Sequence, residues 1–269
     1  MKDLFGYTGK NIIIDGAASG MGLATVRLLV ELGANVWALD IKDVPVPVKK
    51  FILCDLSKKD SIDSVIEQLP DDIDRVFCCA GLPGAPFSVL DVMSVNFIGH
   101  RYLIETLLNR MKNAGAVAII SSLAGMEWMK NYQMVGKMLA TSGFEEAVSW
   151  VQANEQRIKD AGGAYGFSKQ CLCAYVALKA MEFLSKGVRI NSLSPAPTQT
   201  PMMPYFEQEH GQENIKAYSV GGRYATPEEM AEPLLFLNSD MARFITGFDL
   251  KVDNGFVAGM IMQQLGALK

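Results

Sequence analysis

Residues 11–32 read NIIIDGAASGMGLATVRLLVEL, and this stretch decides the fold that the sequence predicts. An apolar strand, Asn11–Asp15, is followed by a glycine-rich turn and then by a helix. Glycines let the backbone turn tightly and approach a pyrophosphate, and the start of the next helix offers free N–H groups. Gly16, Gly20 and Gly22 have the spacing G-x-x-x-G-x-G. Directly after a first strand, such a turn predicts a dinucleotide-binding site.

The rest of the chain repeats this alternation of short apolar runs and longer amphipathic ones. Strands that are apolar throughout are typical of a parallel sheet covered by helices on both faces. The sequence therefore predicts one α/β domain over residues 1–269, with a doubly wound, seven-stranded parallel sheet. The expected strands are 11–15, 35–39, 50–54, 75–79, 116–120, 188–193 and 248–252, and the expected helices are 20–32, a run ending near 69, 89–112, 165–185 and 227–238.

One stretch does not fit that alternation. About forty residues between Ser122 and Tyr165 contain no strand signal. Residues 144–159 (FEEAVSWVQANEQRIK) have helical spacing, and residues 132–141 predict a second, shorter helix. We therefore expect a helical insertion, about 124–163, at the carboxyl edge of the sheet.

The composition narrows the class of protein. Apolar residues make up 49% of the chain and charged residues 20%, which excludes a disordered protein. A net charge of -4 without a basic cluster argues against a nucleic-acid partner. No apolar run approaches the roughly 18 residues that cross a bilayer, and Met1–Lys10 does not resemble a signal peptide. The five cysteines indicate reduced thiols and a cytoplasmic protein, and with only His100 and His210 no Cys/His metal site is expected.

The end of the second strand bears on the choice of cofactor. Asp40 lies there, eighteen residues after Gly22. A carboxylate at this place accepts both hydroxyls of a ribose and repels a 2′-phosphate, and Ser19 stands in the turn where a basic residue would bind that phosphate. Both features predict NAD rather than NADP, with Lys42 as the one feature against. Asp55, after the third strand, is placed to accept the adenine amino group, to cap the following helix, or both.

Tyr165 and Lys169 are four residues apart and share one face of a predicted helix. A phenol with a pKa near 10 is a poor base at neutral pH, but a nearby ammonium and an oxidised nicotinamide both favour the phenolate. Tyr165 would then exchange a proton with an alcohol or ketone. Ser121 and Ser122 end the fifth strand, where a hydroxyl would hold the substrate oxygen beside Tyr165. Asn96, on the long helix, is either functional or a buried amide bonded to backbone.

Taken together, these features resemble the short-chain dehydrogenase/reductase family over almost the whole chain. The matching residues are Gly16, Gly20, Gly22, Asp40, Asp55, Cys79-Ala80-Gly81, Asn96, Ser122, Tyr165-x-x-x-Lys169 and Asn191-x-x-Ser194-Pro195. The resemblance implies a Rossmann fold and the interconversion of a secondary alcohol and a ketone by hydride transfer with NAD. A nearer resemblance is to the bacterial 3α-hydroxysteroid dehydrogenase/carbonyl reductase subgroup, which shares the helical insertion and the segments Asp40–Asp43, Cys79–Leu82 and Ser94–Asn96.

The resemblance also implies a role for each residue. Tyr165 would be the acid/base, and Ser122, with Ser121 as the alternative, would orient the substrate oxygen. Lys169 would bind the nicotinamide ribose and lower the pKa of Tyr165, and Asn96 would hold a water that links Lys169 to solvent. The implied cofactor-binding residues are Gly16, Ser19, Gly20, Met21, Gly22, Asp40, Asp55, Leu56, Cys79, Ala80, Gly81, Tyr165, Lys169, Pro195, Thr198 and Thr200.

Three positions depart from the pattern of the family. Asp15 stands where Thr is usual, and Cys79 stands where Asn is usual. Ala196 stands where Gly usually follows the proline. The first two bear on contacts that stabilise the turn and thus on cofactor affinity, whereas none of the three removes a reacting group.

Methionine and aromatic residues gather after the fifth and sixth strands. They are Met126, Trp128, Met129, Met134, Met138, Met202, Met203, Tyr205 and Phe206. Such residues either line an adaptable apolar pocket or fill the core under the insertion. The first interpretation favours a bulky, largely apolar substrate such as a hydroxysteroid or an alicyclic or aromatic alcohol. The alternatives are a 3-ketoacyl reductase, against which the lack of an Arg cluster counts, a non-catalytic NAD-binding regulatory protein, and an assembly subunit.

The insertion also bears on assembly. The resemblance implies tetramers in which the long helix, about 89–112, and the helix 165–185 form one dimer face. An insertion just before Tyr165 would lie against that face and exclude the partner. The remaining face, about 227–252, would then form a two-fold homodimer. In the alternative, the insertion covers the active site as a lid and the tetramer is intact.

Overall fold

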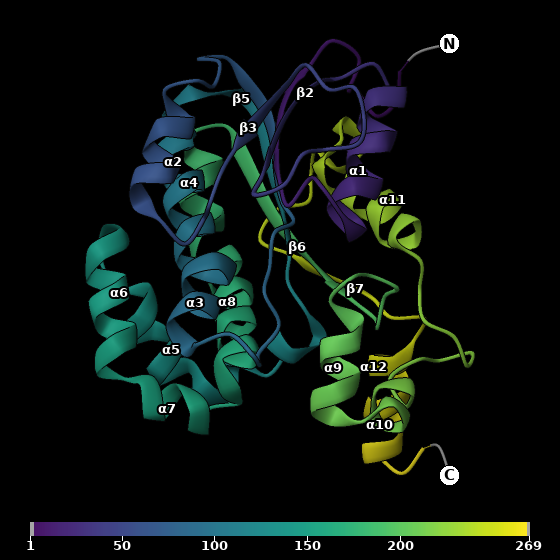
Figure 1. Cartoon of the computed structure of the whole chain (residues 1–269). Coiled ribbons are helices and arrows are strands. Elements are labelled where there is room, and N and C mark those ends of the chain that lie inside the picture. The colour runs from purple at the N-terminus through teal and green to yellow at the C-terminus, as the bar shows by residue number, and fades with distance from the viewer. Residues whose placement is uncertain (1–2, 268–269) are drawn as a thin grey trace.

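The computed structural model describes residues 3–267 and contains a seven-stranded parallel sheet (Figure 1), which confirms the predicted fold class. The strand order β3-β2-β1-β4-β5-β6-β7 reverses between β1 and β4. Open α/β sheets bind ligands at the carboxyl ends of the strands beside such a reversal. The strands are β1 (Asn11–Asp15), β2 (Asn35–Asp40), β3 (Lys50–Leu53), β4 (Ile73–Cys78), β5 (Met111–Ile120), β6 (Val188–Pro195) and β7 (Asp249–Val252).

Helices cover both faces of the sheet, as the wholly apolar strands require. Successive side chains of a strand point to opposite faces, so Ile12 and Ile14 join the core under α1 and α11, while Ile13 joins the core under the other helices. The covering helices are α1 (Gly20–Glu31), α2 (Lys59–Ile66), α3 (Val89–Met93), α4 (His100–Leu107), α8 (Gly163–Ser185) and α11 (Pro227–Asn238).

The helix predicted over residues 89–112 is interrupted. A π-helical segment, Ser94–Gly99 (η1), separates α3 from α4, and a single 3-10 turn, Leu108–Arg110 (η2), ends the run. The sequence prediction was also wrong at the start of β5, which begins at Met111 rather than at residue 116. Residues 112–114 are exposed, and Ala114 has a positive φ of 65°, so this part of the strand has no apolar pattern to mark it.

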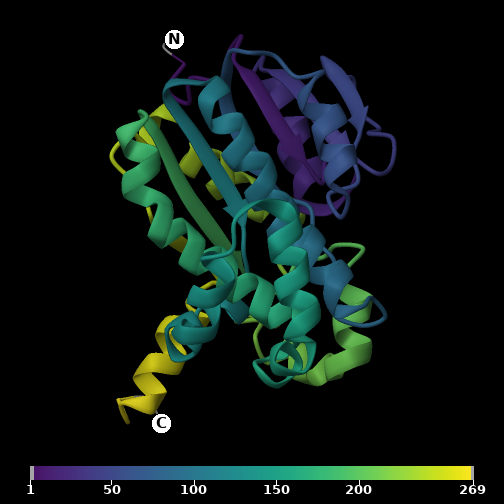
Figure 2. The same ribbon diagram turned by 90° about the vertical axis from the view of Figure 1, so that its left-hand side faces the viewer.

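The predicted helical insertion lies between β5 and α8, at the carboxyl end of the sheet. It consists of two 3-10 turns, Leu123–Gly125 (η3) and Trp128–Asn131 (η4), followed by α5 (Tyr132–Leu139), α6 (Gly143–Ala153) and α7 (Glu155–Asp160). The helix expected over 144–159 is broken at Asn154 into α6 and α7. Figure 2 shows these helices in front of the sheet's lower end, where they pack against α3, η1 and α8.

Three further helices were not predicted. They are α9 (Met203–His210), α10 (Gln212–Lys216) and α12 (Phe256–Gln264), and they lie at the end of the molecule that carries the C-terminus (Figure 1). Met203 and Val257 are the buried residues that these helices contribute. α9 and α10 carry few apolar side chains at helical spacing, whereas α12 has such a stripe that the sequence prediction missed, formed by Phe256, Val257, Met260 and Ile261.

The described part of the chain, residues 3–267, holds no helix long and apolar enough to cross a membrane. Its five cysteines are all free thiols. Burial raises the pKa of Cys54 and of Cys173 to about 12, so these thiols stay protonated and unreactive at neutral pH.

One buried arginine fastens the insertion to the rest of the protein. Arg101, on α4, is 3% exposed. Its guanidinium donates to the carbonyl oxygen of Gly143 at 2.7 Å and to the hydroxyl of Thr141 at 3.1 Å. A weaker bond of 3.4 Å reaches the carbonyl oxygen of Met138. These acceptors all lie at the junction of α5 and α6, so the loss of Arg101 would remove the hydrogen bonds that join α4 to this junction.

We expect Arg101→Met to lower the free energy of unfolding by about 1.5–3 kcal/mol, the usual contribution of hydrogen bonds to a charged group. Methionine keeps the length and apolar stem of the side chain but cannot donate hydrogen bonds. Urea unfolding measures the loss, and limited proteolysis should cut near residues 138–143 sooner than in the wild type. Arg27→Met, at an exposed position of α1, is the matched control. Equal stability and equal cleavage in both variants would contradict the anchoring role of Arg101.

Candidate active site

The glycine-rich turn after β1 has no room for side chains. A Cβ on Gly16 would lie 2.4 Å from the backbone nitrogen of Ala80, and one on Gly22 would lie 2.0 Å from the carbonyl oxygen of Gly16. Gly16 and Gly20 also have positive φ angles of 63° and 53°, which side chains rarely tolerate. The turn leads straight into α1, whose first N–H groups have no acceptor within the helix. These residues fit a pyrophosphate, since the backbone of such a turn can approach it closely.

Asp15 joins the end of β1 to the loop after β4. Its carboxylate is 1% exposed, and Oδ1 accepts the N–H groups of Cys79 at 2.9 Å and of Ala80 at 2.7 Å. The same oxygen lies 3.1 Å from Nε2 of His100. Burial acts to raise the pKa of Asp15, but His100 and the two N–H donors outweigh it and hold that pKa below its usual value. Asp15 and Cys79, which both depart from the pattern of the family, are therefore in contact, because the Asp15 carboxylate accepts the N–H of Cys79 and that of the next residue.

His100 is a site residue that the sequence reasoning missed. It was considered only as a metal ligand, yet its ring is fully buried between α4 and the end of β1. Nδ1 lies 3.1 Å from the carbonyl oxygen of Asn96 and Nε2 faces Asp15. The sequence did contain a signal for this role, namely a histidine within an apolar helical run. A histidine buried by such a run needs a hydrogen-bond partner for each ring nitrogen.

Two carboxylates extend the site along the next strands. Asp40, at the end of β2, accepts the N–H of Ala18 at 2.9 Å, which holds it beside the turn. Asp55, after β3, accepts both the N–H and the hydroxyl of Ser57, at 3.0 and 2.6 Å, and lies 3.0 Å from Nζ of Lys58. Burial acts to raise the pKa of Asp55, but these partners outweigh it and lower that pKa.

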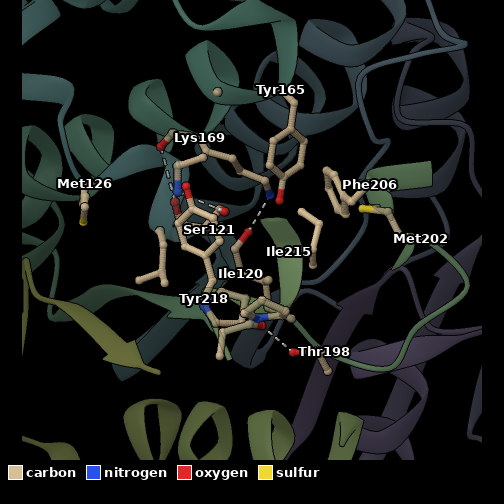
Figure 3. A pocket seen from close by; sticks show the side chains of 18 of the residues that line it. Ile120, Ser121, Met126, Tyr165, Lys169, Thr198, Met202, Phe206, Ile215 and Tyr218 are labelled. Carbon is tan, nitrogen blue, oxygen red and sulfur yellow. Dashed lines mark hydrogen bonds between the residues drawn. The ribbon is translucent and has the colours of Figure 1, made fainter. Parts of the chain in front are cut away.

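Tyr165 and Lys169 share one face of α8, as their spacing predicts, and both line a cavity (Figure 3). Nζ of Lys169 donates to the carbonyl oxygen of Ile120 at 2.9 Å and lies 5.7 Å from the centre of the Tyr165 ring. Burial lowers the pKa of Lys169 to about 8. Burial also raises the pKa of Tyr165, against which a hydrogen bond with the Ser122 hydroxyl acts. At neutral pH this arrangement holds a protonated phenol beside a cation.

The two serines after β5 have different neighbours. The buried Ser121 donates to the carbonyl oxygen of Lys169 at 3.3 Å and lies 3.1 Å from Sγ of Cys173. The hydroxyl of Ser122 accepts the N–H of Ala124 at 3.2 Å and contacts the Tyr165 phenol. Of the pair, Ser122 is therefore the serine whose hydroxyl acts on the acid/base candidate.

Asn96 is buried in the π-helical segment, where its side chain joins two other parts of the site. Oδ1 accepts the N–H of Leu82 at 2.7 Å, and Nδ2 donates to the carbonyl oxygen of Leu82 at 3.0 Å. Nδ2 also lies 3.1 Å from the hydroxyl of Ser168 on α8. The amide thus connects the loop after β4 to the helix that carries Tyr165.

The remaining residues named from the sequence surround the same edge of the sheet. A Cβ on Gly20 would lie 3.2 Å from Cγ2 of Thr200, so the segment after β6 packs on the glycine-rich turn. Ser19 precedes α1 at its N-cap position, and Leu56 is buried after β3. The residues of the predicted cofactor set that line the cavity are Met21, Cys79, Ala80, Gly81, Tyr165, Lys169, Pro195, Thr198 and Thr200.

The cavity has a volume of about 990 Å³ and a largely apolar outer wall. Phe206, on α9, packs edge-on against Tyr165 with the ring centres 4.9 Å apart, and Figure 3 shows Phe206 and Met202 beside that phenol. Of the methionines noted in the sequence, Met126, Met202 and Met203 line the cavity, whereas Met138 is buried in the core. The unpredicted helices α10 and α12 add Ile215, Phe256 and Met260.

Comparison with known proteins was made against family models and individual proteins. One model, described as short chain dehydrogenase, matches residues 10–135, and another, described as enoyl-(acyl carrier protein) reductase, matches residues 135–257. The chain is 32% identical over 253 residues to coniferyl-alcohol dehydrogenase of a Pseudomonas species, covering 93% of this chain and 98% of that protein. It is 32% identical over 260 residues to 3-alpha-hydroxysteroid dehydrogenase/carbonyl reductase of Comamonas testosteroni, covering 93% and 97%.

A solved structure shares the fold. It is the 3-alpha-hydroxysteroid dehydrogenase of Pseudomonas sp. B-0831 complexed with NADH, with a TM-score of 0.80, 28% identity, and coverage of 93% of this chain and 98% of that one. The matched region of this chain includes the glycine-rich turn, the sheet and the helix that carries Tyr165. The chain therefore belongs to the short-chain dehydrogenase/reductase family, as an oxidoreductase that acts on alcohols with a nicotinamide cofactor.

Proposed function

We propose that this protein interconverts a bulky, largely apolar secondary alcohol and its ketone with NAD(H). One observation carries the proposal: Tyr165, Lys169 and Ser122 meet at a cavity whose facing wall is made of methionine and aromatic side chains. Such a wall suits a hydrocarbon skeleton better than a sugar or a phosphorylated metabolite. The names of the similar enzymes, for coniferyl alcohol and for 3-alpha-hydroxysteroids, agree with a ring-bearing substrate.

The chain's own residues would handle the proton. A nicotinamide dinucleotide, held by the glycine-rich turn and Asp40, would supply or accept the hydride. In ketone reduction, Tyr165 donates its phenolic proton to the substrate oxygen, which the Ser122 hydroxyl orients. Alcohol oxidation requires Tyr165 to lose its proton first and then to accept the substrate's proton as phenolate, a state that the Lys169 ammonium and an oxidised nicotinamide would both favour. With a pKa of about 8, Lys169 still carries its charge at neutral pH.

We expect Tyr165→Phe to lower kcat at least about a hundredfold, because the ring remains but its proton is lost. NAD binding should stay close to the wild-type value, which fluorescence titration measures. Tyr132→Phe, at an exposed position of α5, is the control for the loss of a phenol oxygen. Near-native turnover of a ring alcohol by Tyr165→Phe would refute the acid/base assignment.

Three features support NAD over NADP. The Asp40 carboxylate is held at the end of β2 by Ala18, where it would meet the adenosine ribose. Ser19, at the N-cap of α1, offers no charge to a 2′-phosphate. The solved relative of 28% identity is itself a complex with NADH.

Asp40→Ala is expected to narrow the preference for NAD, because it removes the charge that repels a 2′-phosphate. The measurement is the ratio of kcat/KM with NAD to kcat/KM with NADP, which should exceed one in the wild type. Asp43→Ala, three residues further on at an exposed position, should keep the wild-type ratio. A wild type that prefers NADP would show that the interpretation of this strand end is wrong.

Two of the alternative functions considered from the sequence, a 3-ketoacyl reductase and a regulatory protein, have less support. A phosphorylated acyl carrier would need cations at the cavity, and among its described lining residues only Lys169 and His210 can carry a positive charge. A purely regulatory protein has no use for Tyr165, Lys169 and Ser122 around a cavity of this size. The proposed setting is the cytoplasm, which the free thiols support.

We also propose a homodimer formed by α11 and β7. The insertion helices α5 and α7 pack on α8 and would exclude a partner from that part of the helix. β7 is an outer strand of the sheet, and the segment before it presents a fully exposed Phe244 and a half-exposed Phe248. Apolar side chains beside an open strand edge favour pairing with a second copy.

Light scattering should give a mass near twice 29.4 kDa for the wild type. Phe244→Glu should weaken the dimer, because it places a charge within the proposed interface. Met181→Glu, on the exposed second half of α8, is the control and should leave the mass unchanged. A tetramer, or a dimer that Met181→Glu disrupts and Phe244→Glu does not, would refute the proposed face.

A further inference from the structure

Gly166 and Gln170 lie one helical turn apart on α8, next to Tyr165 and Lys169, and both line the cavity. Gly166 is buried, yet a Cβ built on it would have no atom within 4 Å. A buried position that faces empty space shows that the cavity continues along the helix beyond the Tyr165 phenol.

Gln170 offers an unused donor to this space. The residue is 6% exposed, and its Oε1 accepts the Nδ2 group of Asn131 at 3.0 Å. Gln170 lines the cavity, its amide oxygen is held by Asn131, and no residue of 3–267 accepts a hydrogen bond from its amide nitrogen. This nitrogen is not among the buried side-chain atoms that lack a partner, so it is accessible, and a molecule bound in the cavity would find a donor there.

The insertion forms much of this part of the cavity. Asn131, which holds Gln170, ends η4, and Met126 and Glu127 line the cavity from the segment before it. Gly162, just before α8, completes the wall. The insertion therefore builds a polar corner into a cavity that is otherwise largely apolar.

We propose that Gly166 and Gln170 form a second substrate subsite, in which Gln170 donates a hydrogen bond to an oxygen remote from the reacting carbon. This proposal rests on the dehydrogenase function proposed above. Tyr165 and Gln170 are five residues apart, about 7.5 Å along the helix axis at 1.5 Å per residue. A substrate that reaches both carries its second oxygen across a ring from the carbinol. The substrate class is thus a ring alcohol with a distal ether, hydroxyl or carbonyl oxygen.

A pair of probes of equal shape tests the donor. trans-4-Methoxycyclohexanol and trans-4-ethylcyclohexanol differ by one oxygen in place of a methylene group. Wild type should have the higher kcat/KM for the methoxy probe, mainly through KM, and Gln170→Met should lower the methoxy-to-ethyl ratio about three- to tenfold, the worth of one hydrogen bond. Gln152→Met, at an exposed position of α6, should keep the wild-type ratio.

A second variant tests the space independently of the donor. Gly166→Ala places a methyl group in the cavity and suits the helix, so the variant should fold. Gly166→Ala should lower kcat/KM for both substituted probes, relative to kcat/KM for cyclohexanol, by at least about threefold. One methyl group in a pocket can change the preference between two substrates by more than this factor. Gly136→Ala, an exposed helical glycine of α5 with equally open surroundings, should not alter these ratios.

The outcomes separate this inference from the proposed function. Equal methoxy-to-ethyl ratios in wild type and Gln170→Met would overturn the donor role, and unchanged ratios in Gly166→Ala would overturn the subsite. If the wild type oxidises none of the three alcohols, the proposed function fails for this class. Calorimetry with the same probes in the presence of NAD then decides the subsite, because Gln170→Met should still lose its preference for the methoxy probe in binding.

Discussion

The buried carboxylate of Asp15 is the contact on which the site depends. It lies between the ends of β1 and β4, where the strand order reverses, and accepts the N–H groups of Cys79 and Ala80 while facing His100. A buried carboxylate is tolerated only where such donors replace its water. β1, the loop after β4 and the start of α4 are therefore held in one arrangement. Because Gly16 follows Asp15 directly, this arrangement also sets the position of the glycine-rich turn.

From this junction, polar contacts lead to the reacting residues. His100 faces the carbonyl oxygen of Asn96, and the Asn96 amide binds Leu82 and Ser168. The Ser168 hydroxyl in turn donates to the carbonyl oxygen of Tyr165 at 2.7 Å. Hydrogen bonds depend on direction, whereas apolar burial does not. The placement of the Tyr165 helix relative to the nucleotide turn is thus set more sharply than packing alone would set it.

The parts of the site differ in how far the sequence could predict them. Tyr165 and Lys169 share a helix face through local spacing alone, and Asp40 follows an apolar strand, so both placements needed no tertiary information. His100 could not be placed, because its partner Asp15 is 85 residues away. The helices α9 and α10 contribute few buried side chains, so the apolar pattern that reveals helices is weak in these two segments of the cavity wall.

By itself the sequence predicted the parallel sheet, its seven strands, the glycine-rich turn and the candidate reacting residues. Those features follow from apolar periodicity and from short motifs, both of which act within a few residues. The tertiary structure alone decided that Ser122 faces the phenol, that Asn131 holds the Gln170 amide and that Gly166 faces open space. These depend on which distant segments meet around α8, since the insertion holds Gln170 through Asn131 and α9 places Phe206 against Tyr165. No local sequence pattern encodes these contacts, because each one joins residues of different elements that become neighbours only when the elements pack.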